Sequence, residues 1–380
     1  MTHRDRFLRT LRFQSVDHVP DHEFGYWDDT LLAWHEQGLP RDVTSNERAD
    51  VFFGFAPSAQ VPVHQSLLPG FERQVVEQQG DQTLIRDEHG ATCLIFASGK
   101  SSIPHFLDFA LKGREEWERE FRPRLDPDDP RRLPHGEWWE QLKEQWRRRD
   151  YPVGIGIGSL YGWIRDWMGF ERAAMMIHDD PGLMEEIMEQ ITRVVIRTIE
   201  WAAPQVELDF GAGWEDMCFN MGPMISPAAF ERLMVPRYQR IVQTLRRFGV
   251  DIVYTDCDGN INQLVPLWLK AGVNGMFPVE VAGGTDPIAL RDRYGREVLL
   301  LGGVNKRALI AGKQAIRKEI KRIEPYVREG GWIPHVDHRV PPDVTYDNYL
   351  YYLAVKRDTF GIPEPPPWEE RRPARWGDAT

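Results

Sequence analysis

Short apolar runs alternate with amphipathic stretches from residue 151 onward. The runs have the length of strands, and they cover residues 151–158, 206–211, 251–259, 273–280, 298–303 and 331–338. Between them, helical spacing of apolar residues and helix-start signals predict helices at 180–203, 226–248, 260–270, 313–329 and 345–360. A chain in which strands and helices alternate favours a parallel α/β fold, and we predict a (β/α)8 TIM barrel.

The first 150 residues are less regular. Thr2 is a suitable N-cap for a first helix. Residues 16–27 predict a turn and then a short strand, and residues 83–98 predict a β-hairpin. Segments 114–122 and 136–149 are rich in Glu, Arg and Trp and predict helices that lie over a surface.

A single TIM-barrel domain is therefore expected over residues 1–361. Residues 1–150 would supply N-terminal strands, the hairpin and capping helices, and residues 151–361 the regular β/α units. The remaining stretch, 362–380, is rich in proline and charge and is expected to be an extended tail.

Composition narrows the class of partner. The net charge of -11 argues against nucleic acid and anionic membrane surfaces, because basic patches supply most of that affinity. Cys93, Cys218 and Cys257 form no CxxC pair, so a reducing compartment is expected. The charged N-terminus lacks the apolar core of a signal peptide, and no run approaches the ~20 apolar residues of a membrane span. These features predict a cytoplasmic protein.

Polar clusters in the second half follow apolar runs and precede the next helix. In a TIM barrel such positions meet at the C-terminal mouth, where these enzymes carry their chemistry. The shared rim would comprise Glu215, Asp216, Asp256, Asp258, Glu280, His335, Asp337 and His338. The alternative is chance, combined with helix N-capping by the acids.

The run DIVYTDCDG contains the most informative pair. Asp256 and Asp258 are two residues apart, so on a strand both side chains point to the same side. Two adjacent carboxylates repel each other unless a metal ion, a cationic side chain or a shared proton lies between them.

Aromatic and polar residues at other strand ends are candidates for a substrate pocket. One cluster, at the end of the short N-terminal strand, is His22, Glu23 and Tyr26. Trp163, Trp214 and Phe277, with Tyr161, could wall a pocket for a small aromatic or sugar-like substrate. The alternatives are a polar loop for the first cluster and ordinary strand-end packing for the aromatic residues.

Three motifs resemble the uroporphyrinogen decarboxylase superfamily: RDRFLRTLRFQSVDHVP, GGVNKR and HRVPPDVTYDNY. The resemblance extends over nearly the whole chain, to about Gly361. It implies a TIM barrel and two branches of chemistry. One branch is the cofactor-free decarboxylase of porphyrinogens, and the other comprises zinc methyltransferases that exchange methyl groups between a corrinoid protein and a small substrate.

The decarboxylase branch carries an arginine-rich, RQAGRY-like segment after its VDRVP motif, which binds the propionates of the substrate. The corresponding stretch here, DHEFGYWDD, is acidic and aromatic and contains no arginine. A polyanionic porphyrinogen would meet repulsion there, so the resemblance favours the methyltransferase branch.

The methyltransferase branch holds zinc through an HxCGN-like motif and a later CGLPP-like motif. Alignment on Gly259-Asn260 places Asp256 at the histidine and Asp258 at the cysteine, and HRVPP places His338 at the second cysteine. Cys257 falls between the two positions and on a strand would point the other way. The resemblance thus implies metal ligands at Asp256, Asp258 and His338.

Further roles follow for the remaining rim residues. Glu280 and Glu215 are candidates for the remaining ligand or for a proton donor. His335 and Asp337 could orient His338, and His335 and Tyr161 join the catalytic candidates. An acid and histidine network without any ion is the alternative.

Carboxylate and imidazole ligands suit zinc, with manganese or iron(II) as alternatives. A metal there would polarise an ether oxygen for O-demethylation. We therefore expect a methyltransferase that activates a methylated small molecule, with the corrinoid on a separate protein because the chain has no DxHxxG module. The alternatives are a divergent decarboxylase or lyase acting on a small carboxylate, and a binding protein that kept only the barrel. A homodimer is suggested by the resemblance alone.

Overall fold

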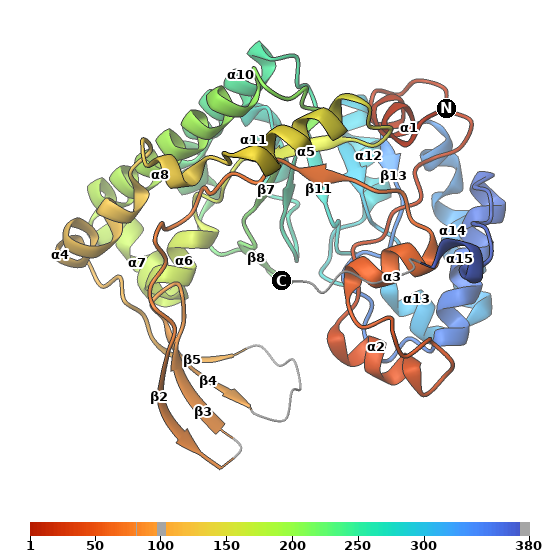
Figure 1. Cartoon of the computed structure of the whole chain (residues 1–380), viewed down its shortest axis with the longest axis horizontal. Coiled ribbons are helices and arrows are strands. Elements are labelled where there is room, and N and C mark those ends of the chain that lie inside the picture. Colours follow the sequence, from red (N-terminus) through yellow and green to blue (C-terminus); the bar gives the residue numbers. More distant parts are fainter. Residues whose placement is uncertain (81, 97–103, 373–380) are drawn as a thin grey trace.

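The computed structural model describes residues 1–80, 82–96 and 104–372. Its centre is a curved parallel sheet in the order β1-β6-β7-β10-β11-β12-β13. The strands are β1 (Ala59–Gln60), β6 (Val153–Gly156), β7 (Phe210–Trp214), β10 (Val253–Asp256), β11 (Gly275–Phe277), β12 (Leu299–Leu301) and β13 (Trp332–Ile333). Helices surround this sheet (Figure 1), which confirms the predicted TIM-barrel-like fold.

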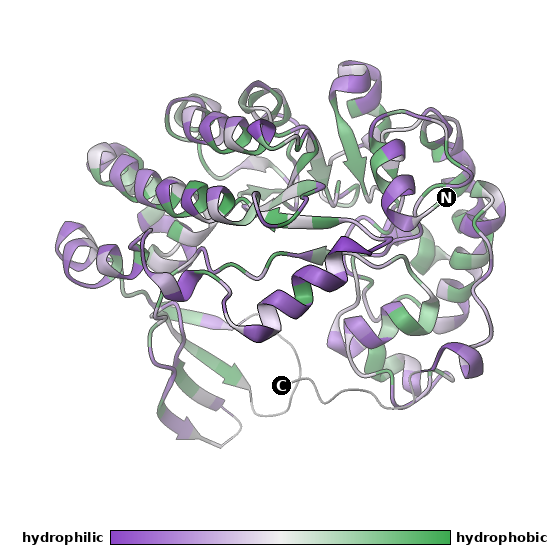
Figure 2. Cartoon of the chain, turned by 45° about the horizontal axis from the view of Figure 1, so that its top comes forward, coloured by the Kyte–Doolittle hydropathy of each residue, from purple (hydrophilic) through white to green (hydrophobic). Residues whose placement is uncertain are grey.

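The helices of the second half cover the outside of the sheet. They are α6 (Gly162–Met168), α7 (Phe170–Asp179), α8 (Pro181–Ala202), α9 (Pro227–Leu233), α10 (Val235–Arg247), α11 (Val265–Ala271), α12 (Pro287–Tyr294), α13 (Lys306–Ala311), α14 (Lys313–Arg328) and α15 (Tyr346–Phe360). The strands they cover are mostly hydrophobic, and the helices turn polar sides outward (Figure 2). Burial of these apolar faces holds the barrel together.

The predicted short N-terminal strand forms only a single parallel bridge, between Tyr26 and Val340. The amide of Val340 donates to the carbonyl of Gly25 at 2.9 Å, and on the other side the amide of Ala56 donates to the carbonyl of Asp21 at 2.8 Å. This extended segment therefore lies between the two ends of the sheet and closes the barrel.

The N-terminal region adds a capped helix and a separate sheet. Helix α1 (His3–Leu11) begins at Thr2, whose side chain forms a capping box with Asp5. The predicted hairpin is β3 (Gln82–Arg86) and β4 (Thr92–Phe96). It belongs to an antiparallel sheet that projects from the barrel (Figure 1). The other strands and helices of this region are β2 (Gln74–Gln79), β5 (His105–Asp108), α2 (Asp28–His35), α3 (Asn46–Phe53), α4 (Arg114–Glu116) and α5 (Glu137–Arg147).

Several boundaries differ from the sequence prediction. The helix expected at 226–248 is interrupted at Met234 and continues as α10 with a proline in its first turn, because proline lacks the amide that would continue the helix. The helix expected from residue 260 begins at Val265, and the strand expected at 206–211 begins at Phe210. The segment 114–122 continues α4 as a π-helical turn at Trp117–Phe121.

Other short elements lie in loops and in the tail. They are β8 (Cys218–Phe219), β9 (Gly222–Pro223) and α16 (Trp368–Arg371). The expected extended tail thus contains one short helix, and its residues 373–380 lie outside the described part, as do residues 97–98 of the predicted hairpin. In the described ranges, none of the helices has the length and apolarity needed to cross a membrane.

Candidate functional site

Three carboxylates meet at the carboxyl ends of two neighbouring strands. Asp256 ends β10, Asp258 follows two residues later, and Asp216 follows β7. Strands β7 and β10 pair in parallel with Asp256 opposite Trp214, so the loops after them leave side by side. One carboxylate oxygen from each of Asp216, Asp256 and Asp258 lies within 4.8 Å of the others.

The backbone of Asp216 has an uncommon conformation that places its side chain in this group. Its φ of 41° lies in the left-handed region, which few non-glycine residues adopt. Its Oδ1 accepts a hydrogen bond of 3.2 Å from the amide of Asp258. The loops after β7 and β10 are therefore tied together at the carboxylates themselves.

His338 joins the carboxylates from the loop after β13. Its Nε2 lies 3.0 Å from Oδ2 of Asp258. Its ring packs against Phe24 and Trp27, with centroid distances of 5.7 Å and 5.6 Å. The predicted ligands Asp256, Asp258 and His338 thus come together. His338 contacts the three-carboxylate group through its hydrogen bond with Asp258.

The negative charges of the three carboxylates are only partly offset by positive charges nearby. Burial, followed by the charge of Asp258, raises the pKa of Asp216 to about 6. Burial and the charges of Asp216 and Asp258 raise the pKa of Asp256 well above its ordinary value. Burial acts to lower the pKa of His338, but its hydrogen bond to Asp258 and the charge of Asp258 outweigh this effect and raise it. A proton or a cation would therefore stabilise the group.

The donor atoms fit a divalent cation. Oδ1 of Asp258 is buried and has no hydrogen-bond partner in the described part of the chain. A buried carboxylate oxygen without a partner is unfavourable unless an ion or water binds it. Three carboxylates with an adjacent imidazole make an oxygen-rich set that suits zinc, manganese or iron(II).

Cys257 faces away from the carboxylates. Its Sγ accepts a hydrogen bond of 3.4 Å from the amide of Met217 and lies beside the thiol of Cys218. Burial raises the pKa of Cys257 well above its ordinary value, which disfavours the thiolate that binds metals. The alternation along the strand end predicts this orientation.

Glu280, a candidate for the remaining ligand, is held by other groups. Its Oε1 lies 2.7 Å from Nζ of Lys306, and its Oε2 accepts a hydrogen bond of 2.9 Å from the amide of Gly259. The structure places Asp216, and neither Glu280 nor Glu215, with Asp256 and Asp258.

Glu215, the other candidate, is fully buried in a hydrogen-bond network. Its carboxylate accepts bonds of 2.7–2.9 Å from the amides of Leu160, Tyr161 and Gly162, and a further bond from the hydroxyl of Tyr238. Burial raises the pKa of Glu215, and these bonds oppose that rise. Glu215 thus ties the loop after β6 to the loop after β7. Tyr161 is buried in the same loop.

His335 and Asp337 lie behind the mouth. Burial lowers the pKa of His335 to about 3, and its Nδ1 lies 2.8 Å from the carbonyl of Val336. Asp337 accepts hydrogen bonds from the amides of Lys306 (2.8 Å) and Ala282 (3.1 Å). Within the described residues no hydrogen bond joins either side chain to His338. Asp337 instead fixes the loops after β11 and β12.

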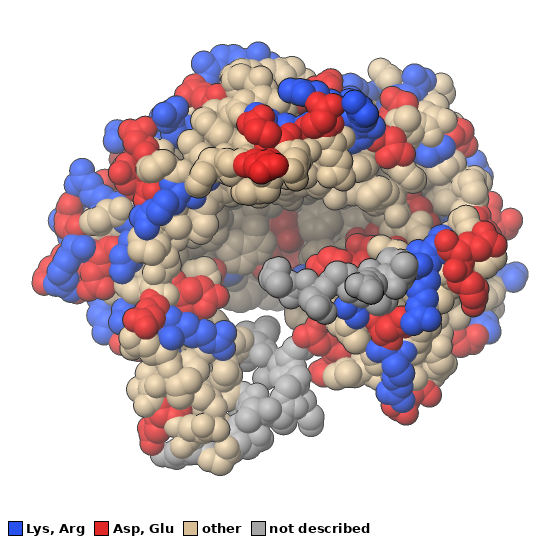
Figure 3. Space-filling view, in the orientation of Figure 1, with Lys and Arg blue, Asp and Glu red and all other residues tan. Residues whose placement is uncertain are grey.

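Of the predicted aromatic residues, Trp163, Trp214 and Phe277 line a cavity of about 380 Å³ that includes Asp256, whereas Tyr161 is not part of its lining. Its side-chain walls are Gln60, Gln65, Trp163, Trp214, Tyr254 and Phe277. The face drawn in Figure 3 is hollowed at its centre, and acidic atoms lie inside the hollow. A small, flat molecule placed here would have a carboxylate of the acid cluster beside it.

The N-terminal candidates lie elsewhere. Tyr26 is buried, and its hydroxyl lies 2.7 Å from that of Tyr349 among the rings of α2, α3 and α15. His22 and Glu23 line a separate cavity of about 310 Å³ with Asp50. Burial raises the pKa of Glu23 to about 7 and lowers that of His22 to about 4. These residues belong to the barrel-closing segment itself, and none of them lines the aromatic cavity.

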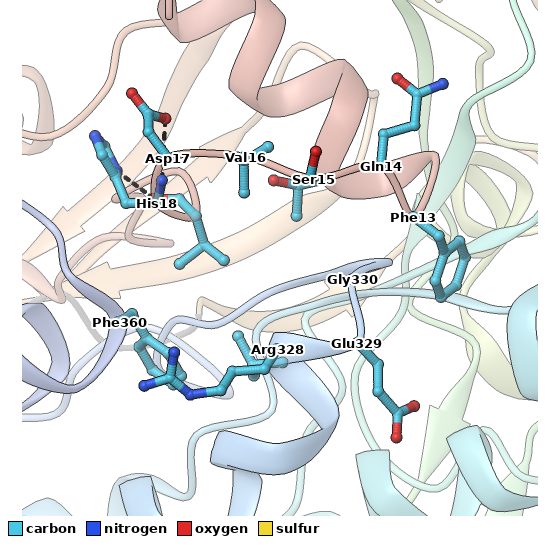
Figure 4. A pocket seen from close by; sticks show the side chains of 13 residues that line it. Phe13, Gln14, Ser15, Val16, Asp17, His18, Arg328, Glu329, Gly330 and Phe360 are labelled. Carbon is cyan, nitrogen blue, oxygen red and sulfur yellow. Dashed lines mark hydrogen bonds between the residues drawn. The ribbon is translucent and has the colours of Figure 1, made fainter.

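Another cavity, of about 320 Å³, lies at the opposite end of the barrel (Figure 4). Its lining runs from Phe13 to Val19 and over Arg328, Glu329 and Gly330, which precede β13. In TIM barrels this amino-terminal face contributes stability, and the chemistry lies at the other face.

Two arginines, neither of them predicted from the sequence, flank the acid cluster. The guanidinium of Arg165 donates to the carbonyl of Asp216 and lies 5.3 Å from the Trp214 ring. Arg339 follows His338 directly. Tyr254, two residues before Asp256 on β10, could have been found from the strand alternation, whereas Gln60 and Gln65 lie in an irregular stretch that gives no such signal.

Known proteins resemble this chain in sequence and in fold. Residues 114–357 match the model of the family described as uroporphyrinogen decarboxylase (URO-D). A uroporphyrinogen decarboxylase of Xanthomonas campestris pv. campestris is 25% identical over 381 residues, which cover 92% of this chain and 96% of that protein. The uroporphyrinogen decarboxylase of Thermus thermophilus is 22% identical over 195 residues, which cover 49% of this chain but only 52% of that protein.

A solved structure has the same fold. The methyltransferase from Methanosarcina mazei superposes with a TM-score of 0.61 at 15% identity, over 95% of this chain and 99% of that protein. At this identity the likeness establishes the fold alone. The family match covers most of the described barrel, from α4 to α15. The chain therefore belongs to the uroporphyrinogen decarboxylase (URO-D) family.

Proposed function

We propose that this protein is a metal-dependent methyltransferase that activates a methylated small molecule, of the ether or O-methyl type, for transfer to a separate corrinoid protein. The observation that carries the proposal is the meeting of Asp216, Asp256 and Asp258 with His338 at the mouth of the barrel. Asp256 also lines the aromatic cavity, so the candidate metal ligands and the candidate substrate pocket are continuous.

Asp216, Asp256, Asp258 and His338 would hold the metal, with zinc as the first candidate and manganese or iron(II) as alternatives. When bound, such an ion supplies a Lewis acid that polarises an ether oxygen. Trp163, Trp214 and Phe277 would orient the substrate and keep water from it.

Protonation of the substrate oxygen would complete the reaction. The methyl group would pass from the substrate oxygen to the reduced, nucleophilic corrinoid of the partner protein, which supplies the electron pair of the new bond. The oxygen would keep the electron pair of the broken bond and gain a proton. Because Asp216 would be an ionised metal ligand, the proton would come from solvent.

A decarboxylase or other lyase acting on a small carboxylate is the second candidate. The raised pKa values of Asp216 and Asp256 favour it, because a protonated carboxyl group can protonate a carbanion after loss of carbon dioxide. A porphyrinogen is a poor substrate for this site, because the stretch DHEFGYWDD carries no arginine for its propionates.

Metal analysis of the purified protein tests the proposal. We expect one equivalent of a divalent metal in the wild type and its loss in Asp256→Ala and His338→Ala. The exposed residues Asp343 and His178 provide matched controls, Asp343→Ala and His178→Ala, which should retain the metal. Wild-type protein without stoichiometric metal, or unchanged metal in both site variants, would remove the main support.

A substrate panel then separates the two reactions. Methyl transfer requires added corrinoid protein and yields a demethylated product. Decarboxylation releases carbon dioxide whether or not corrinoid is present.

A further inference from the structure

Arg339 and His338 share one aromatic support. The guanidinium carbon of Arg339 lies 5.5 Å from the ring centroid of Phe24 and 5.8 Å from that of Trp27. The imidazole of His338 packs against the same two rings. The guanidinium is therefore held next to the imidazole that contacts Asp258, and its position is fixed by stacking.

Apart from these two rings, Arg339 has few binding partners among the described residues. Its one hydrogen bond, from Nη1 to the carbonyl of Tyr26, is long at 3.4 Å. Among the described residues Arg339 forms no ion pair, although its charge helps the hydrogen bonds from Ser45 and the backbone to lower the pKa of the Glu47 carboxyl. By comparison, Arg165 on the other flank of the acid cluster donates to the carbonyl of Asp216 and pairs with Asp166.

The charge of Arg339 acts on the mouth of the barrel. It opposes the rise in the pKa of Asp256, whose carboxyl lines the aromatic cavity. Phe24 in turn contacts Phe277, another wall of that cavity, with ring centroids 4.6 Å apart. The guanidinium is thus partly exposed and separated from the cavity by the ring of Phe24.

We propose that Arg339 binds a carboxylate of the substrate, so that the substrate is a methylated carboxylic acid. The inference rests on the proposed function and specifies its substrate class. A guanidinium already fixed by two aromatic faces can offer two parallel N–H groups to a carboxylate without further ordering of its side chain. The carboxylate would be anchored beside His338, which contacts Asp258 of the acid cluster.

Two other roles for Arg339 make different predictions. If it only offsets the charge of the acid cluster, its removal would change metal content and would not change selectivity between ligands. If it only packs against Phe24 and Trp27, a lysine with the same charge and a similar stem would serve equally well.

Equilibrium binding to the metal-loaded protein provides the test. The probes are 4-methoxybenzoate and the neutral 4-methoxybenzamide, measured by calorimetry without corrinoid. We expect the wild type to bind the carboxylate at least about tenfold more tightly than the amide, as a charge-assisted pair of hydrogen bonds requires. Arg339→Gln should abolish that preference and leave amide binding and metal content unchanged, and Arg339→Lys should restore it only in part.

The exposed Arg307 supplies a control of the same type, and Arg307→Gln should keep the preference. Equal binding of the two probes by the wild type, binding of neither, or a preference that survives Arg339→Gln would overturn the inference. The outcome is independent of methyl transfer. A protein that holds metal and transfers methyl groups without preferring carboxylates would refute only the role of Arg339, whereas a carboxylate preference without methyl transfer would refute only the proposed reaction.

Discussion

Nε2 of His338 lies 3.0 Å from Oδ2 of Asp258, although 80 residues separate them in sequence. In the absence of metal this contact favours the protonated imidazole, and the pKa of His338 is raised as a result, although burial acts against it. A neutral imidazole is the form that binds metals. Protons and metal ions therefore compete for the same nitrogen.

Metal affinity should consequently fall as the pH falls. Below the raised pKa of His338 each metal ion must displace the imidazolium proton, and the carboxyl of Asp216, with a pKa of about 6, adds a second. We expect the dissociation constant for zinc to rise about tenfold per pH unit for each displaced proton. Competition with a chromophoric chelator between pH 5 and 8 measures this, and a constant affinity over that range would contradict it.

Asp216→Asn should stabilise the metal-free protein at pH 7.5. The folded-state pKa of Asp216 is raised from 3.8 to about 6, so its contribution to stability is lost as the pH rises through that interval. Asparagine keeps the Oδ1 that accepts from the amide of Asp258 and removes the charge. We expect the free energy of unfolding to rise by about 3 kcal/mol.

Urea denaturation with chelator present measures this change. In the presence of metal the order should reverse, because the variant loses a ligand. A variant that is less stable than the wild type in both conditions would show that Asp216 is not strained by its charge.

Glu215→Gln should lower the free energy of unfolding. The buried carboxylate accepts from three backbone amides and from Tyr238, and a glutamine amide replaces one acceptor oxygen with a donor. The expected loss is roughly 2–4 kcal/mol in the free energy of unfolding. Tyr238→Phe, which removes only one donor, should cost about 1 kcal/mol. Wild-type stability combined with lost activity would instead give Glu215 the chemical role predicted from the sequence.

Cys257→Ala should leave metal content unchanged. The thiol faces Met217 and Cys218, on the side of the loop away from the carboxylates. Asp258→Ala, one residue further along, should lose the metal. Equal loss in both variants would indicate that the loop rearranges to present the thiol.

Much of the fold was predictable, because strand length and helical spacing depend on local sequence. The caps at Thr2 and Thr345 and the helix from Pro181 to Ala202 follow such patterns. The reduction of the short strand expected in 16–27 to one bridge was not predictable, since its extended backbone is fixed by contacts with the far end of the chain.

The candidate site was predictable where it depends on alternation along a strand end. Asp256 and Asp258 were paired in this way, and the resemblance added His338. The place of Asp216 depends on a left-handed backbone conformation, and that of Glu215 on amides of another loop. Neither feature leaves a pattern in the sequence. Arg339 became a candidate only when Phe24 and Trp27 were seen to hold it.

The bridge between Tyr26 and Val340 lies where the first and last parts of the chain meet. Phe24 and Trp27, close to Tyr26 in sequence, pack against His338 and Arg339, which precede Val340. If this bridge breaks, the candidate ligand His338 and the proposed anion-binding Arg339 would be displaced together. The strands from β6 to β12 would stay paired. Inactivation by mild heat or denaturant should then precede the loss of most secondary structure.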